Sequence, residues 1–225
     1  MKKVLIVVTN HATLGSTDKA NGTYSPELTH ALHVFTQSGL DYEIASIQGG
    51  KAPIYGTDIE GDEVNSQVLS DVNFQNQMNN TVPVHQLKIE DYDAIFYPGG
   101  FGLLSDLASN EDFARLAASH YENGGVIGAV CHGPAALLNI KLANGDYLIN
   151  GKKLTGFSNT EEDQVKLTHV VPFSLQDQLT ERGASYSAAA NWQSKVVVDQ
   201  RLVTGQNPQS AAAVGVALVN LLTTK

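Results

Sequence analysis

One cysteine and the histidine that follows it are the residues of this chain best suited to chemistry. Cys131 is the only cysteine among the 225 residues, and His132 is its direct neighbour. A thiolate is a strong nucleophile, and an imidazole beside it can take its proton or stabilise its charge. The pair predicts a covalent mechanism in which the sulfur attacks an electron-poor carbon.

A sharp turn between a strand and a helix is expected to present this cysteine. The apolar run Val126–Val130 leads directly into Cys131, and Gly133 and Pro134 then interrupt it. Such a turn projects a nucleophile above the carboxyl ends of a sheet and places it near the start of a helix. We therefore predict that backbone N–H groups lower the pKa of Cys131. The structural alternative is a small buried cysteine that only ends a core strand.

A second strand ends in a glycine-rich turn that could face the same crevice. The run Ala94–Tyr97 is followed by Pro98, Gly99, Gly100 and Phe101. An oxyanion that develops on a carbonyl needs two fixed N–H donors about 3 Å away. Backbone N–H groups of the Gly99-Gly100 turn, together with the amide of His132, could supply them. A pair of glycines after a strand can also mark nothing more than a tight turn.

Positioning these turns requires a parallel sheet. Short β-branched runs alternate with stretches of helical spacing, which indicates βαβ units. We predict a three-layer α/β/α sandwich with a flavodoxin-like, mostly parallel sheet, formed by residues 1–225 as one domain. The expected strands are Val4–Val8, Tyr42–Ser46, Ala94–Tyr97, Val126–Val130 and Lys195–Asp199.

Other local signals mark helix starts and one long insertion. Ser25-Pro26 and Asn207-Pro208 each place a capping residue before a proline suited to the first helical position. Asn159 and Glu162 have the spacing of a capping box. The segment from about residue 49 to 86 is rich in Asn, Asp, Gln and Gly, with one short helix expected near Asp71–Asn79. Insertions of this kind are often lids or partner surfaces.

Composition argues against several classes of partner. The formal net charge is −9, from 23 acidic and 14 basic residues, and no Lys/Arg cluster could bind a phosphate backbone. No stretch approaches the roughly 18 apolar residues of a membrane span. A single cysteine favours a reducing compartment. We therefore expect a cytoplasmic protein that binds neither nucleic acid nor membrane.

No cofactor or metal is expected either. The glycine-rich turns do not fit a phosphate-binding fingerprint. Five further histidines are not joined by carboxylates or cysteines into a ligand set, although two of them have helical spacing. These histidines are His11, His30, His33, His85 and His169.

Several motifs, in order along nearly the whole chain, resemble the ThiJ/PfpI superfamily, which has the fold of the class I glutamine amidotransferases. The similarity is greatest to its branch of heat-shock chaperones and glutathione-independent glyoxalases (glyoxalase III). The segments that carry it are Tyr24–Leu28, Ile44–Ser46 with Gly49-Gly50, Asp91–Gly100, Ala129–Leu138, Leu154–Glu162, Val171–Phe173 and Thr204–Pro208.

The resemblance implies roles for individual residues. Cys131 corresponds to the nucleophile, and Glu27 to a carboxyl that reaches its sulfur from the first long helix. His132 would act as a base oriented by Glu162, the third position of the family, although Glu161 is close enough to compete for that assignment. Phe101 stands where near relatives usually have histidine, which makes the rim of the pocket more apolar and puts the substrate in question.

The activity implied by the resemblance is the conversion of a small 2-oxoaldehyde such as methylglyoxal into a 2-hydroxy acid, without a cofactor. Two alternatives of other classes use the same sulfur. One is a stress chaperone or redox sensor in which Cys131 is oxidised. The other is a protein deglycase or a small-molecule amide or isocyanide hydrolase. Family members are commonly dimers, so a homodimer is the expected partner state.

Overall fold

Seven strands form the central sheet in the computed structural model, which describes residues 1–223. All neighbouring pairs are parallel except the edge pair β10 and β11, which is antiparallel. The strands follow the order β10 (Val196–Asp199), β11 (Leu202–Gly205), β7 (Val126–Val130), β6 (Ala94–Tyr97), β1 (Lys3–Val7), β3 (Asp41–Ser46) and β5 (Val82–Pro83). The expected mostly parallel sheet is therefore confirmed.

The five expected strands agree with the structure to within one residue at each end, but two strands of the sheet were not expected. One is β11, a buried four-residue strand that pairs with β7 on one side and β10 on the other. A tight turn at Gln200, whose φ is 57°, joins β10 to β11. The other is the two-residue strand β5 at the opposite edge. Strand β5 is too short for a recognisable alternation of side chains, and β11 follows β10 after only two residues.

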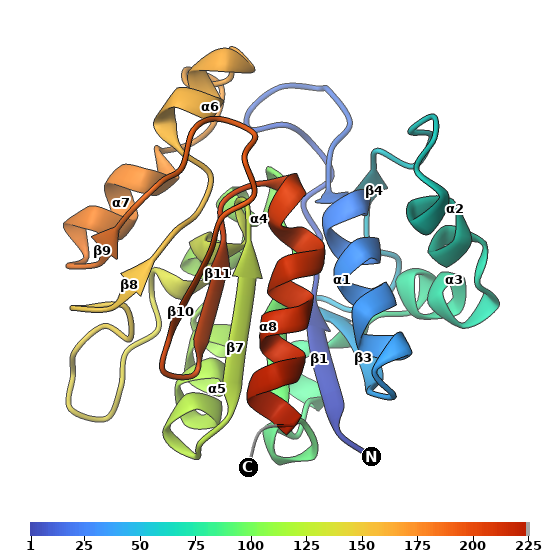
Figure 1. Cartoon of the computed structure of the whole chain (residues 1–225), viewed down its shortest axis with the longest axis horizontal. Helices are drawn as coiled ribbons and strands as arrows, with labels where there is room; N and C mark the ends of the chain where they lie inside the picture. The colour runs from blue at the N-terminus through green and yellow to red at the C-terminus, as the bar shows by residue number, and fades with distance from the viewer. Residues whose placement is uncertain (224–225) are drawn as a thin grey trace.

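Helices cover both faces of the sheet and complete the three layers (Figure 1). Helices α1 (Ser25–Gln37) and α8 (Ala211–Thr223) pack side by side on one face, and α5 (Glu111–Glu122) lies on the other. Gly215 lets α8 approach α1, because a Cβ there would lie 3.1 Å from Cβ of Val34. Gly128 in β7 leaves room for Leu218 of α8 in the same way.

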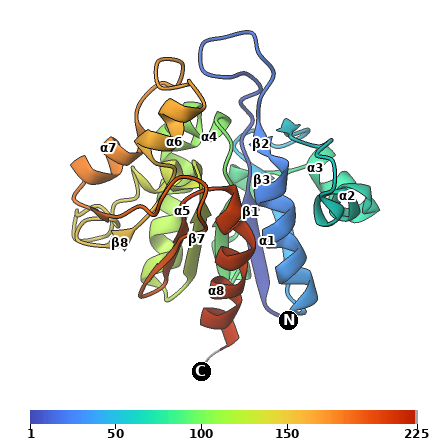
Figure 2. The ribbon, with the colours of Figure 1, turned by 45° about the horizontal axis from the view of Figure 1, so that its top comes forward.

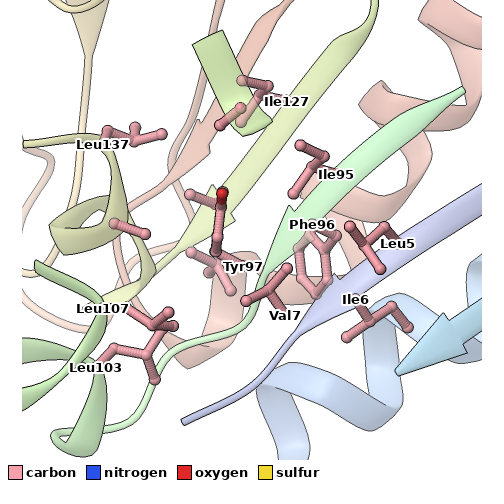
Figure 3. Packing of buried hydrophobic residues seen from close by; sticks show 14 of the residues in the cluster. Leu5, Ile6, Val7, Ile95, Phe96, Tyr97, Leu103, Leu107, Ile127 and Leu137 are labelled. Atoms are coloured by element: carbon pink, nitrogen blue, oxygen red, sulfur yellow. The ribbon is translucent and has the colours of Figure 1, made fainter. Parts of the chain in front are cut away.

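The core lies between these layers, and its strands are buried on both faces. Ile95 and Phe96 are neighbours in β6 and are both fully buried, although adjacent strand residues point to opposite faces. Figure 3 shows them among side chains of β1 and β7, such as Leu5 and Ile127. Continuous apolar runs of this kind are typical of a parallel sheet covered on both sides. This packing fixes the carboxyl ends of β6 and β7 side by side.

The segment from residue 49 to 86 contains more regular structure than expected. The helix expected near Asp71–Asn79 is α3 (Val72–Asn79), and the Asp71 side chain caps it. A second helix, α2 (Glu63–Ser70), precedes it and packs on α1. The two-residue strand β4 (Ile54–Tyr55) pairs in parallel with β2 (Thr23–Tyr24), just before α1.

The remaining elements are short segments between the strands and the longer helices. The loop that follows β1 rises above the strand ends, and α6 lies beside it (Figures 1 and 2). No helix among residues 1–223 is long and apolar enough to cross a membrane. The short elements not yet named are η1 (Val84–Gln86), η2 (Ile89–Asp91), α4 (Gly102–Ser105), η3 (Leu107–Ser109), η4 (Gly133–Leu137), β8 (Lys153–Leu154), α6 (Asn159–Gln164), α7 (Leu175–Glu181), β9 (Ser185–Tyr186) and η5 (Pro208–Ser210).

Candidate active site

Cys131 lies at the carboxyl end of β7 in a strained backbone conformation. Its φ is 59°, a region that residues with a Cβ rarely adopt. The Cys131 N–H donates to the carbonyl of Gly205 at 2.9 Å, and the N–H of Phe157 donates to the Cys131 carbonyl at 2.8 Å. A Cβ on Gly133 would lie 2.3 Å from the carbonyl oxygen of Tyr97. These contacts hold the turn and present the sulfur above the sheet, as a nucleophile elbow does.

The expected lowering of the pKa of Cys131 is wrong for the free protein. The turn leads into the five-residue 3₁₀ segment η4 and not into an α-helix, so the aligned dipoles of a long helix are missing at the sulfur. Cys131 is 5% exposed, and its burial raises the pKa of the thiol. The nearby carboxylates of Glu27 and Glu162 raise it further, while the N–H of His132 acts weakly in the opposite direction.

A chain of polar contacts runs from the sulfur to a buried carboxylate. Nδ1 of His132 lies 3.5 Å from Sγ of Cys131, and Nε2 of His132 lies 2.8 Å from Oε2 of Glu162. All three residues are buried, and His132 is only 1% exposed. A carboxylate that accepts from one ring nitrogen leaves the other free to take a proton from the sulfur.

Glu162, and not Glu161, is the carboxylate that reaches this histidine. Both belong to the short helix α6. The Ser158 hydroxyl accepts from the backbone N–H of Glu161, and the Glu161 carboxylate accepts from the N–H of Ser158. The capping box is thus formed by Ser158 and Glu161, which corrects the pair expected from the spacing of Asn159 and Glu162.

The Glu161 carboxylate also connects α6 to segments far along the chain. It accepts from the backbone N–H of Trp192 at 2.9 Å, from Nε2 of Gln206 at 3.0 Å and from Nδ2 of Asn207 at 2.8 Å. Hydrogen bonds from Asn207, Trp192 and Ser158 hold the pKa of this carboxyl below its usual range, although burial opposes them. Glu161 thereby fixes the helix that carries Glu162.

Glu27 faces the sulfur from the first turn of α1. Its side chain is fully buried, and burial raises its pKa to about 8, although the Cys131 thiol and the Gly99 N–H partly oppose this. A Cβ on Gly99 would lie 2.0 Å from Oε2 of Glu27 and 2.7 Å from Cβ of Cys131. Within residues 1–223 neither carboxyl oxygen has a hydrogen-bond partner of good geometry. At neutral pH Glu27 is therefore protonated and can donate toward the sulfur.

Two phenyl rings pack against the imidazole. The ring centroids of Phe101 and His132 are 4.6 Å apart, and those of His132 and Phe157 are 4.5 Å apart. Phe157 in turn contacts the indole of Trp192 at a centroid distance of 5.8 Å. Phe101 therefore does more than line an apolar rim, because it helps to fix the orientation of His132. Phe157 was not singled out from the sequence, where an isolated phenylalanine carries no signal.

The glycine-rich turn after β6 lies against Glu27 and the elbow. The backbone N–H of Gly99 helps to lower the pKa of the Glu27 carboxyl, and that of His132 helps to lower the pKa of the Cys131 thiol, although burial outweighs both. Gly100 has a φ of 120°, and a Cβ there would lie 2.3 Å from the carbonyl oxygen of Gly22. Only glycine fits at this position.

Across residues 1–223, no group of three or more His, Cys, Asp or Glu side chains converges in a way that could hold a metal ion. The two histidines with helical spacing, His30 and His33, do not act as a pair. His30 instead contacts the Asp62 carboxylate at 2.9 Å.

The fold and this site define an α/β protein with a buried cysteine on a nucleophile elbow. The chain belongs to the DJ-1/PfpI family, whose model matches residues 19–221. The resemblance read from the sequence motifs is thereby confirmed at the level of the family.

Individual relatives and solved structures show which members of the family this chain is similar to. The chain is 33% identical to "Glyoxalase 3" of Candida albicans, over 94% of each chain. It is 30% identical to "Glutathione-independent glyoxalase HSP31" of Saccharomyces cerevisiae, over 98% of each chain. The solved structure of Candida albicans glyoxalase III superposes with a TM-score of 0.89 at 31% identity, covering 98% of this chain and 97% of that one. The Rapid Encystment Protein 24 KDa of Francisella tularensis superposes with a TM-score of 0.95 at 42% identity, over the full length of both.

Proposed function

We propose that this protein is a cofactor-independent glyoxalase that converts a small 2-oxoaldehyde, such as methylglyoxal, into a 2-hydroxy acid. Relatives named as glutathione-independent glyoxalases, matched over nearly the full chain, support this activity. The observation that carries it is that the buried Glu27 carboxyl, whose pKa is raised to about 8, and Nδ1 of His132 both approach the Cys131 sulfur. An acid and a base that flank a nucleophile are what a proton transfer between adjacent carbons needs.

In the first step the thiol becomes a nucleophile when substrate is present. His132 takes the proton of Cys131 through Nδ1, and the Glu162 carboxylate stabilises the imidazolium through Nε2. The sulfur adds to the aldehyde carbon, the carbon–oxygen π bond breaks, and His132 returns its proton to the aldehyde oxygen. The product is a hemithioacetal on Cys131 and a neutral imidazole.

The second step moves hydrogen between the two carbons. His132 removes the proton from the former aldehyde carbon while Glu27 gives its proton to the ketone oxygen, which yields an enediol. His132 then delivers its proton to the former ketone carbon. Glu27 takes back a proton from the hydroxyl on the other carbon. The first carbon is oxidised to a thioester and the second is reduced to an alcohol, so no external oxidant is needed.

Hydrolysis completes the cycle. His132 takes a proton from water, which attacks the thioester carbon, and the carbon–sulfur bond breaks. The Cys131 sulfur leaves with that proton and regenerates the thiol. The N–H groups of His132 and Gly100 are the proposed donors to the oxyanion of this step. The net reaction adds one water to the 2-oxoaldehyde.

The burial of the sulfur favours a small free substrate. Cys131 is 5% exposed, and the half-buried Phe101 ring packs on the neighbouring His132. A glycated side chain on a folded protein would have to extend into this enclosed space. We therefore favour a free aldehyde over the deglycase alternative, and the buried sulfur also weighs against a role as a readily oxidised sensor.

We further propose that the protein works in the cytoplasm, where a single thiol stays reduced, and that it forms a homodimer, as the family resemblance implies. Sedimentation velocity measures the oligomeric state.

Product analysis tests the function directly. The protein is incubated with methylglyoxal without glutathione, metal or nicotinamide, and lactate is measured for the wild type and for Cys131→Ala. We expect lactate from the wild type and none from the variant. A wild-type protein that yields no lactate, or a variant that still produces it, rejects the proposal. Suppression of aggregation by both proteins in that case would support the chaperone alternative.

A further inference from the structure

A tyrosine of the segment 49–86 is brought to the active site by a two-residue ladder. Strand β4 pairs in parallel with β2, with Tyr55 opposite Tyr24. The two rings pack together with centroids 5.0 Å apart. Tyr24 immediately precedes α1, and Glu27 lies in the first turn of that helix. Tyr55 therefore lies beside the residues that lead into the helix carrying the acid.

The same ladder packs against the turn between Glu27 and the sulfur. The N–H of Tyr24 donates to the carbonyl of Gly99 at 3.0 Å. A Cβ on Gly100 would lie 2.8 Å from the backbone nitrogen of Tyr24. Gly99 lies against both Glu27 and Cys131, since a Cβ there would meet both side chains. The Gly99-Gly100 turn therefore lies between the surroundings of Cys131 and the backbone of Tyr24. The Tyr55 ring packs on the Tyr24 ring.

Buried polar contacts hold the segment in this position. The Asn65 amide oxygen of α2 accepts from the hydroxyls of Ser25 and Thr29, and all three residues are buried. The Asp62 carboxylate, which lies just before α2, contacts His30, the residue after Thr29, at 2.9 Å. Because these five polar side chains join α1 to the start of α2, the segment does not slide relative to α1. The position of Tyr55 relative to Glu27 is therefore fixed.

The Tyr55 hydroxyl is kept protonated. Its burial raises the pKa of the phenol well above the usual range, and Glu27 and Cys131 raise it further whenever they are ionised. The neighbouring Asn21 side chain acts in the opposite direction and is outweighed. The ladder and the packing on Tyr24 place this phenol next to the Gly99-Gly100 turn, and because it stays protonated its hydroxyl is a permanent hydrogen-bond donor there.

We propose that Tyr55 binds the substrate, its hydroxyl donating a hydrogen bond to the ketone oxygen of the bound 2-oxoaldehyde. This assignment rests on the proposed glyoxalase function and deepens it. The ketone oxygen gains negative charge when hydrogen leaves the adjacent carbon, and a second donor beside Glu27 stabilises that charge. The segment 49–86 is then a wall of the active site and supplies one of its polar groups.

The hydroxyl is tested by Tyr55→Phe, which keeps the ring and its packing on Tyr24. We expect kcat/KM for methylglyoxal to fall about 100-fold, mainly in kcat, as when one oxyanion donor is lost. The melting temperature and the rate at which iodoacetamide alkylates Cys131 should stay at the wild-type values. The matched control is Tyr42→Phe, which removes a hydroxyl bonded to Asn73 of the same segment, away from the sulfur. Its kcat/KM should equal that of the wild type.

The possible results separate this assignment from the function on which it rests. Full activity in Tyr55→Phe overturns the assignment and leaves the glyoxalase proposal intact. Loss of activity that is accompanied by an equal loss of melting temperature or of Cys131 alkylation also overturns it, because the hydroxyl would then be structural. A wild-type protein that makes no lactate overturns both proposals.

Discussion

Oε2 of Glu162 lies 2.8 Å from Nε2 of His132, in surroundings where both side chains are almost fully buried. The other oxygen of Glu162, Oε1, has no hydrogen-bond partner among the described residues. A carboxylate in this position fixes the ring tautomer that presents an unprotonated Nδ1 to Cys131. The orientation of the base is therefore set by one residue of α6.

Replacement of Glu162 by Gln should slow turnover with little effect on the fold. An amide N–H can donate to Nε2 and so favours the tautomer with a proton on Nδ1, which cannot accept from the thiol. We expect a loss of roughly 100-fold in kcat, within the range that general bases contribute. The matched control is Asp163→Asn in the same helix, which should keep wild-type kcat. Equal kcat for Glu162→Gln and the wild type contradicts the assignment.

Replacement of Glu161 by Gln should instead destabilise the protein. Its buried carboxylate accepts hydrogen bonds from Ser158, Trp192, Gln206 and Asn207, and an amide cannot accept all of them. We expect the free energy of unfolding to fall by about 1–3 kcal/mol. Urea denaturation measures this, and kcat per folded molecule should change far less than for Glu162→Gln. The reverse order of effects on kcat would show that the wrong carboxylate has been assigned.

The burial of Glu27 should lower the free energy of unfolding at neutral pH. Its pKa rises from about 4.5 in the unfolded chain to about 8 in the folded protein. Below about pH 4.5 the carboxyl is protonated in both the folded and the unfolded state, so its burial does not lower the free energy of unfolding. As the pH rises toward 8, the unfolded chain loses this proton while the folded protein keeps it, and the free energy of unfolding falls. Glu27→Gln should therefore increase the free energy of unfolding, by on the order of 3 kcal/mol at pH 7, and abolish turnover. Denaturation at pH 5 and pH 8 measures the difference, which should be larger at pH 8.

The thiol pKa should depend on the same carboxyl. Burial and the charge of Glu27 raise the pKa of Cys131, so the rate of iodoacetamide alkylation should rise with a midpoint above about 8.5, the value of a free thiol. In Glu27→Gln the charge is absent, and the midpoint should move to lower pH. A wild-type midpoint below that of free cysteine would mean that the protein activates the thiol before substrate binds.

The Phe101 side chain should influence both the base and the choice of substrate. Phe101→His introduces the residue that the family resemblance implies at this position, and it removes apolar surface while leaving a ring beside His132. We expect the ratio of kcat/KM for phenylglyoxal to that for methylglyoxal to fall about 10-fold, which is the size of selectivity that an apolar contact supplies. An unchanged ratio would show that Phe101 acts only on the orientation of His132.

The parallel sheet and its main strands were predictable because their apolar runs are long and end at turn residues. Cys131 and its elbow were visible for the same reason, since Gly133 and Pro134 follow a strand directly. The pKa direction was not predictable, because it depends on how deeply Glu27 is buried against the sulfur. Tyr55 was also missed, since a two-residue ladder with Tyr24 leaves no pattern in the sequence. The contact of Phe157 with His132 likewise depends on tertiary packing alone.

The order of the strands has a consequence for how the protein acquires its activity. Glu27 follows β2, Gly99 follows β6, Cys131 follows β7 and Glu162 lies on α6, so the site draws on segments more than half the chain apart. Parallel neighbours cannot form through local hairpins, and pairing across long loops is slow. During refolding, helical circular dichroism should therefore recover before lactate production does. The last contact to form, and not the first, determines when a newly made chain begins to work.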